Sequence, residues 1–65
     1  MLPTWTTIVI YHINRANGKV DQFVDTEDVT ANSLQAARDT IVRSIKFKHD
    51  GENVVIDSLR VVGIS

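Results

Sequence analysis

The sequence predicts a small α+β domain in which a three-stranded antiparallel sheet carries one helix packed on one face. Three observations lead to this fold class. An apolar, β-branched run spans Thr7–Ile13, an Asn-Gly turn follows at Asn17-Gly18, and a helix-periodic stretch precedes a second apolar run at Val54–Ile64. The element order is therefore strand, strand, helix, strand, within a single domain of residues 1–65.

The central strand is predicted at Thr7–Ile13, the most apolar run in the chain. Alternation places large apolar side chains on both of its faces. One face carries Trp5, Val9, Tyr11 and Ile13, and the other carries Ile8 and Ile10. A strand with one solvated face alternates more cleanly between apolar and polar residues, so neither face of this strand is typical of a solvent-exposed surface.

A hairpin turn is predicted at Asn17-Gly18, because both residues tolerate the positive φ that favoured two-residue hairpin turns require. The returning strand begins with Lys19–Val24. The acidic group Asp25–Asp28 then either bends this strand through a bulge or forms a loop before a short extra strand. We favour one long, bent strand that continues to Ala31.

The helix is predicted over Ser33–Phe47, and Asn32 and Ser33 are both favourable N-cap residues. Its apolar stripe consists of Leu34, Ala37, Ile41, Val42 and Ile45. The last strand, Val54–Ile64, is apolar on both faces and has a predicted kink at Asp57-Ser58. A right-handed crossover places this strand beside the first and antiparallel to it, which gives the spatial order 2-1-3.

Composition limits the classes of function. A core of 65 residues rarely supplies more than about 3–5 kcal/mol, and without Cys there is no disulfide to add to it. Seven Lys and Arg against eight Asp and Glu leave no basic stripe for nucleic acid. No apolar run approaches the ~20 residues of a membrane span, and the first residues do not show the basic segment, apolar region and small-residue cleavage site of a signal peptide. We therefore expect a cytoplasmic protein that binds neither nucleic acid nor membrane.

No residue pattern indicates catalysis. His12 and His49 are the residues that titrate near neutrality, and neither has a companion at a diagnostic spacing, so we interpret them as ordinary sheet and loop residues. The acidic residues of the second strand lack the interleaved Gly and terminal Glu of a calcium loop. We expect no enzyme activity, no cofactor and no metal.

Spare apolar side chains predict association with a partner. One helix covers one face, so either the set with Trp5 and Tyr11 or the set with Ile8 and Ile10 is left for a partner. The acidic group would either dock on a basic surface or form a solvated edge that prevents aggregation. Arg60 is either an interface residue, a role for which Arg is favoured, or an ordinary solvent-facing strand residue. The candidate partner-binding residues are Trp5, Tyr11, Asp25, Glu27, Asp28 and Arg60.

Two hypotheses for function follow from these residues. The first is a non-enzymatic binding protein that docks on a host macromolecule and alters its activity. The second is a structural homo-oligomer that pairs through the uncovered sheet face, with room for a small ligand.

The segment Ala31-Asn32-Ser33-Leu34-Gln35-Ala36-Ala37 and the element order resemble the small early protein by which T7-like phages inhibit bacterial RNA polymerase. That family has a comparable spacing of Ala, hydroxyl cap, Leu and Ala. Its last strand carries two arginines two residues apart that contact the polymerase; Arg60 falls on the first position and Val62 on the second. The resemblance implies a phage-encoded inhibitor of a host protein such as RNA polymerase, acting in the host cytoplasm.

Overall fold

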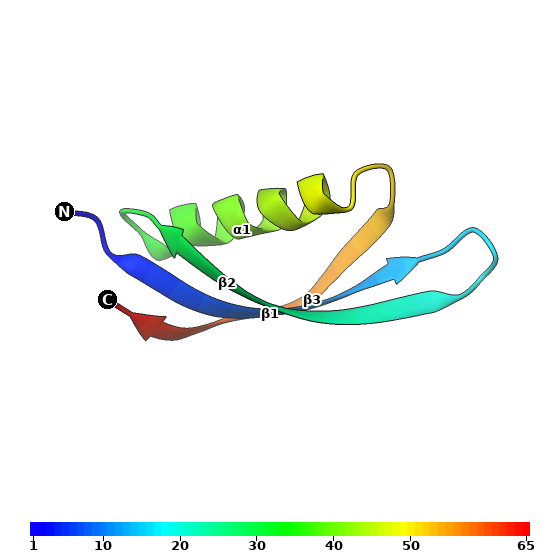
Figure 1. Ribbon diagram of the computed structural model, residues 1–65, viewed down its shortest axis with the longest axis horizontal. Coiled ribbons are helices and arrows are strands. Elements are labelled where there is room, and N and C mark those ends of the chain that lie inside the picture. The colour runs from blue at the N-terminus through cyan, green and yellow to red at the C-terminus, as the bar shows by residue number, and fades with distance from the viewer.

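The computed structural model describes all 65 residues. Its elements are β1 (Thr4–Asn14), β2 (Val20–Thr30), α1 (Leu34–Lys48) and β3 (Asn53–Ile64). The strands form one antiparallel sheet in the order β2-β1-β3, with α1 lying along one face (Figure 1). The fold class and the strand order predicted from the sequence are confirmed.

The helix covers the β1 face that carries Tyr11. Burial alternates along β1, so that Thr7, Val9, Tyr11 and Ile13 are buried while the residues between them are half-buried. From α1, the residues Ala37, Ile41 and Ile45 pack against this row, at the helical spacing that gathers them on one side. The core is completed by half-buried residues from the outer strands: Phe23, Val29, Val54, Ile56 and Leu59.

The turn between β1 and β2 differs from the predicted two-residue turn. Gly18 has a φ of 82°, but no non-glycine residue has a positive φ, so Asn17 does not take the left-handed conformation. Gly18 N–H donates to the Arg15 carbonyl (3.1 Å), and Arg15 N–H donates to the Lys19 carbonyl (2.8 Å). This pattern is that of a three-residue hairpin loop, in which a β-turn is followed by a left-handed glycine.

Strand β2 is continuous through the acidic group, as favoured from the sequence, but it contains no bulge. Its register with β1 is unbroken from Val20 to Thr30. The bulges are in β3, where the register with β1 shifts twice and leaves Asp57 and Val62 without a partner residue. The kink predicted at Asp57-Ser58 is the first of these shifts, and such bulges increase the twist of a strand.

The helix is capped by Ser33, whose Oγ accepts a hydrogen bond from Ala36 N–H (3.1 Å). The alternative cap at Asn32 is therefore wrong. At the other end, His49 N–H donates to the Ile45 carbonyl (3.1 Å), and Gly51 takes a φ of 81° in the loop that leads to β3.

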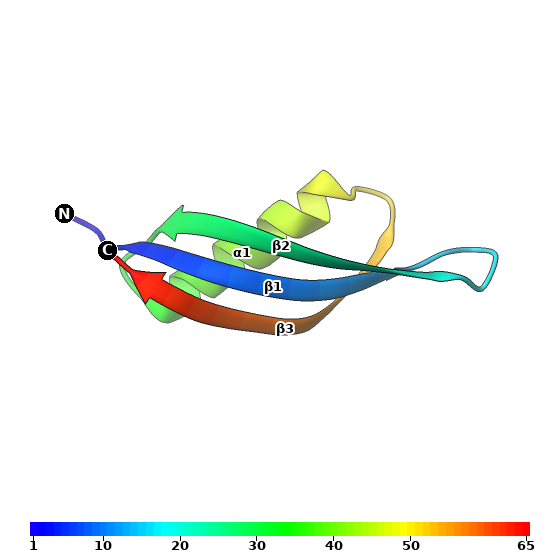
Figure 2. The same ribbon diagram turned by 60° about the horizontal axis from the view of Figure 1, so that its bottom comes forward.

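The molecule is elongated, with Cα extents of 46 × 19 × 14 Å. The β1–β2 hairpin extends past the end of α1, and both chain termini lie at the opposite end of the sheet (Figures 1 and 2). Both outer strands pair with β1 alone, so β2 and β3 each present one unpaired edge.

Candidate binding surface

The sheet face opposite α1 has no covering layer, and we call it the uncovered face (Figure 2). Ile8 and Ile10 lie at its centre, because strand alternation points them away from the buried face. Pairing between strands sets Val24 beside Ile10, and Arg60 beside Ile8. The uncovered face comprises Thr6, Ile8, Ile10, His12, Gln22, Val24, Thr26, Asp28, Val55, Asp57, Ser58 and Arg60.

The apolar centre of the uncovered face is open to solvent at its margins. Val24 is 65% exposed, and the outer strands leave Ile8 and Ile10 half-buried. Val62, at the second bulge, is 55% exposed and borders the face. Complete burial of one Val or Ile side chain contributes about 1.5–3 kcal/mol, so a partner seated here gains a term comparable to the ~3–5 kcal/mol expected of the domain's own core.

Charged side chains lie around this apolar centre. His12 Nδ1 is 2.8 Å from Oδ2 of Asp57, which joins β1 to the first bulge of β3. Asp28 and Arg60, both predicted as partner contacts, are exposed on the uncovered face. Neither forms an ion pair within the chain. Their charges are therefore available to a partner.

Tyr11, predicted as a partner contact, is fully buried under α1, so its side chain is not on the surface of the chain. Trp5, another predicted contact, is half-buried on the same side, and its indole N–H donates to the Ala31 carbonyl (2.9 Å). The face with the larger side chains is the one that the helix covers.

The predicted acidic docking group does not form one surface. Because β2 runs straight through it, alternation points Asp28 to the uncovered face and Asp25 and Glu27 to the helix side, where both are half-buried. Asp25 is engaged within the fold and is not free for a partner.

Asp25 and Tyr11 belong to a hydrogen-bond network at the end of α1. Tyr11 Oη lies 2.7 Å from Asp25 Oδ2 and 2.9 Å from His49 Nε2, and Lys48 Nζ lies 3.0 Å from the same Asp25 oxygen. A carboxylate only accepts, so the single hydroxyl proton of Tyr11 goes to Asp25 and the phenol oxygen accepts from His49 Nε2–H. His49 Nδ1 faces Glu52 Oε1 at 3.2 Å. The network ties the last turn of the helix to the sheet.

Both titration shifts in the chain occur in this network. Burial raises the pKa of Tyr11 to about 12, and the hydrogen bond and the negative charge of Asp25 act in the same direction. The hydrogen bond from Tyr11 lowers the pKa of Asp25; burial opposes this change, and Lys48 reinforces it. Tyr11 is fully buried, hydroxyl included, so the group with the strongly raised pKa has no access to a substrate.

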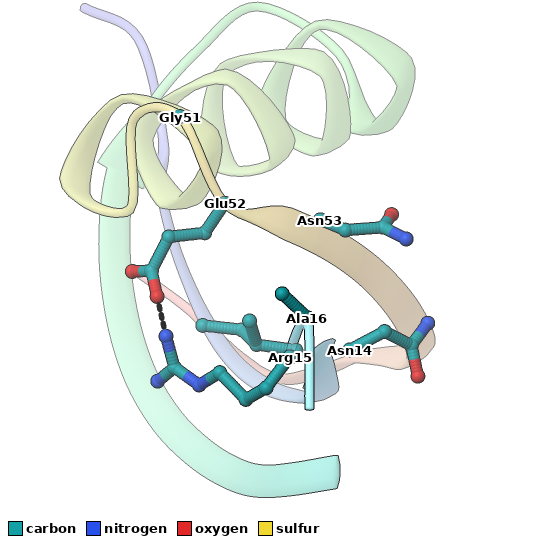
Figure 3. A pocket seen from close by; sticks show the side chains of 7 residues that line it. Asn14, Arg15, Ala16, Gly51, Glu52 and Asn53 are labelled. Atoms are coloured by element: carbon teal, nitrogen blue, oxygen red, sulfur yellow. Dashed lines mark ion pairs between the residues drawn. The ribbon is translucent and has the colours of Figure 1, made fainter. Parts of the chain in front are cut away.

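A shallow cleft of about 430 Å³ lies between the end of β1 and the loop before β3. Figure 3 shows Arg15 and Glu52 paired across it. Arg15 Nε also lies 2.9 Å from Asp21 Oδ2, so two carboxylates already neutralise this cation. The cleft therefore offers no free charge to hold an anionic ligand.

Comparisons of the chain with protein-family models, with curated protein sequences and with solved structures give no match. No three His, Cys, Asp or Glu side chains are placed together to hold a metal ion. The helix lacks the length and apolar character needed to cross a bilayer. Among the surfaces described above, the uncovered face is the one that combines exposed apolar side chains with unpaired charges.

Sequence reasoning missed three contacts, two of which join residues far apart in the chain. His12 pairs with Asp57, and His49 meets Tyr11 and Glu52. The i, i+3 spacing of His49 and Glu52 was a usable local signal for one contact. No local pattern reveals the pairing of His12 with Asp57, because it depends on the β1–β3 register and its bulge.

Proposed function

We propose that this chain is a small, non-enzymatic protein-binding module that docks through the uncovered face. The observation that supports this proposal is that Ile8 and Ile10 lie on this face without a covering layer, beside the exposed Val24. The unpaired charges of Asp28 and Arg60 lie close to them. Protein interfaces commonly have an apolar centre with a polar rim, and Arg is enriched in them.

The partner we propose is a host protein, with bacterial RNA polymerase as the first to test and inhibition or modulation as the outcome. Support comes from Arg60, which is exposed on the uncovered face at the position where the resembling phage family has the first of its polymerase-contacting arginines. Val62, at the second position, is also exposed and borders the same face. The setting is the cytoplasm of the infected cell.

Val24→Glu tests the docking surface. It adds a charge at the apolar centre on a side chain that is already 65% exposed, so the fold is expected to persist. Phe47→Glu is the matched control, because Phe47 is 85% exposed near the end of α1 and lies away from the uncovered face. Circular dichroism of both variants checks folding before binding is measured.

Purified bacterial RNA polymerase is passed over each immobilised protein, and a bacterial lysate is passed in parallel. The expected result is a partner retained by the wild type and by Phe47→Glu but weakened at least tenfold by Val24→Glu. If Val24→Glu retains the partner as well as the wild type does, the docking surface lies elsewhere on the molecule. If the immobilised wild-type protein, at micromolar concentration, retains no other protein, the proposal fails.

Self-pairing through the same face is the alternative function, a structural homo-oligomer. It is favoured by the presence of both Asp28 and Arg60 on that face, since a face with both signs of charge can complement its own copy. Light scattering separates the two readings. A dimer that Val24→Glu returns to monomer supports self-pairing through the face, whereas a monomer leaves the face free for another protein.

A further inference from the structure

The two unpaired edges of the sheet differ in charge. Strand β2 carries four acidic residues and no basic one: Asp21, Asp25, Glu27 and Asp28. Two copies of this edge would repel each other, and charged edge strands are one way in which proteins prevent pairing between sheets. Strand β3 has no such like-charge protection, because its charged residues are one acid and one base, Asp57 and Arg60.

Strand β3 is otherwise suited to pairing. It is 12 residues long, contains no Pro, and is rich in β-branched and other apolar residues. Its backbone pairs with β1 along one side and with nothing along the other. A long, apolar strand with a free edge presents its N–H and C=O groups to another strand.

The sequence of β3 is complementary to itself when two copies run antiparallel. With a twofold axis at Leu59, and with the bulge residues Asp57 and Ser58 counted as one position, the bulge of one copy lies opposite Arg60 of the other, and the reverse arrangement forms by symmetry. The side chains of Asp57 and Arg60 both belong to the uncovered face, and residues directly opposite on one face have Cβ atoms about 4.5–5.5 Å apart. The same register matches residue types further out. Ile56 lies opposite Val61, both on the helix side.

We propose that two copies of this chain pair through their β3 edges, antiparallel, and join their two sheets into one continuous sheet. The pairing uses the backbone of β3 and the Asp57–Arg60 pairs, and it leaves the apolar centre of the uncovered face at Ile10 and Val24 open. Both helices then lie on the same side of the joined sheet, and the two uncovered faces lie side by side.

The geometry sets the expected strength of this dimer. Twelve residues of strand extend about 40 Å, and a single sheet layer is about 10 Å deep, so each copy buries a strip of about 400 Å². The total of about 800 Å² is below the ~1,200 Å² of stable interfaces and belongs to weak, concentration-dependent association. We therefore expect dissociation constants in the micromolar range.

Sedimentation equilibrium of the full chain from about 5 to about 500 µM tests the proposal, since association of this kind depends on protomer concentration. The expected result is a rise from 7.3 kDa toward twice that mass. Asp57→Arg and Arg60→Asp each create two like-charge pairs and should weaken the dimer at least tenfold. The double swap, Asp57→Arg with Arg60→Asp, restores opposite charges and should return the dissociation constant to within about threefold of the wild type.

Rescue by the double swap separates pairing from damage to the fold, because the double variant also loses the contact between His12 and Asp57. Val62→Lys is the second probe, since a lysine on an edge strand opposes pairing and this side chain is already exposed. Val24→Glu lies on the far edge of the sheet and should leave the dimer intact. A monomer at the highest concentration, single reversals without effect, or a dimer broken by Val24→Glu would each overturn the proposal.

Discussion

Replacement of Tyr11 by Phe removes one hydroxyl from the core and leaves the ring in place. The ring stacks on Phe23 with centroids 5.3 Å apart, and the variant keeps that contact. What is lost is the hydrogen bond to Asp25 (2.7 Å) and the one to His49 (2.9 Å). A hydrogen bond to a charged group contributes about 1.5–3 kcal/mol net, so we expect the free energy of unfolding to fall by about 2–3 kcal/mol.

The same substitution should remove an alkaline transition. The pKa of Tyr11 rises from its ordinary 10.0 to about 12 in the folded chain. A folded-state pKa above the unfolded one means that this contribution to stability is complete below pH 10 and is lost as the pH rises toward 12. At roughly 1.4 kcal/mol for each pKa unit, the wild type should lose roughly 2–3 kcal/mol across that window. Phe has no proton to lose, so this part of the alkaline dependence is absent from the variant.

The assay is urea unfolding followed by the fluorescence of Trp5, the single Trp, at neutral and alkaline pH. Tyr11 is the single Tyr, so tyrosinate absorbance reports its ionisation directly. We expect the folded protein to titrate well above 10, and the two unfolding curves to converge in stability as the pH approaches 12. A tyrosinate titration near 10 in the folded state, or equal alkaline slopes for both proteins, would refute the reasoning from burial and the Asp25 contact.

Four further expectations concern single contacts. Ile41→Ala empties a site that is 2% exposed between α1 and the sheet and should cost about 2–5 kcal/mol in urea unfolding; a cost below about 1 kcal/mol would contradict the packing. Ser33→Ala removes the acceptor for Ala36 N–H and should cost about 1 kcal/mol, with Asn32→Ala near neutral as its control; the reverse order would reassign the cap. Gly18→Ala forces a φ of 82° on a residue with a Cβ and should lower stability by roughly 1–2 kcal/mol in the same melts, whereas an unchanged midpoint would contradict the left-handed turn. The hydrogen bond from Tyr11 lowers the pKa of Asp25, so the stability that this carboxylate contributes is complete above its ordinary pKa of 3.8 and is lost as the pH falls through its pKa in the folded chain. Asp25→Asn should therefore reduce the loss of stability at acidic pH in a circular dichroism titration. An unchanged loss at acidic pH would count against the contact.

The element order and the strand order could be predicted from the sequence because each depends on local or nearby signals. The β-branched run of β1, the glycine of the turn, the N-cap and the apolar stripe of α1 each act over a few residues. Two predicted details, the form of the hairpin turn and the position of the bend, were wrong. The turn used the left-handed conformation at Gly18 alone, and the strand bent in β3 rather than at the acidic group of β2.

The choice of the covered face could not be predicted, because both faces of β1 carry apolar side chains. In the structure, Tyr11 lies on the covered side, where its hydroxyl finds Asp25 from β2 and His49 from the end of α1. A buried phenol needs such partners, and they come from residues 14 and 38 positions further along the chain. Two of the predicted contact residues, Asp28 and Arg60, are exposed on the uncovered face, whereas Tyr11 and Asp25 are used by the fold itself.

Arg60 links the two proposals and makes them distinguishable. In the β3-paired dimer its guanidinium is engaged by Asp57 of the other copy, whereas docking through the polar rim of the uncovered face needs the same charge. A partner that relies on Arg60 must therefore dissociate the dimer, and its binding should weaken as the chain is concentrated. A partner that relies on the apolar centre at Ile10 and Val24 competes with nothing on β3, and the joined sheet offers it two adjacent sites. Sedimentation of the chain mixed with its partner separates these cases, because the first gives complexes with one copy of the chain and the second gives complexes with two.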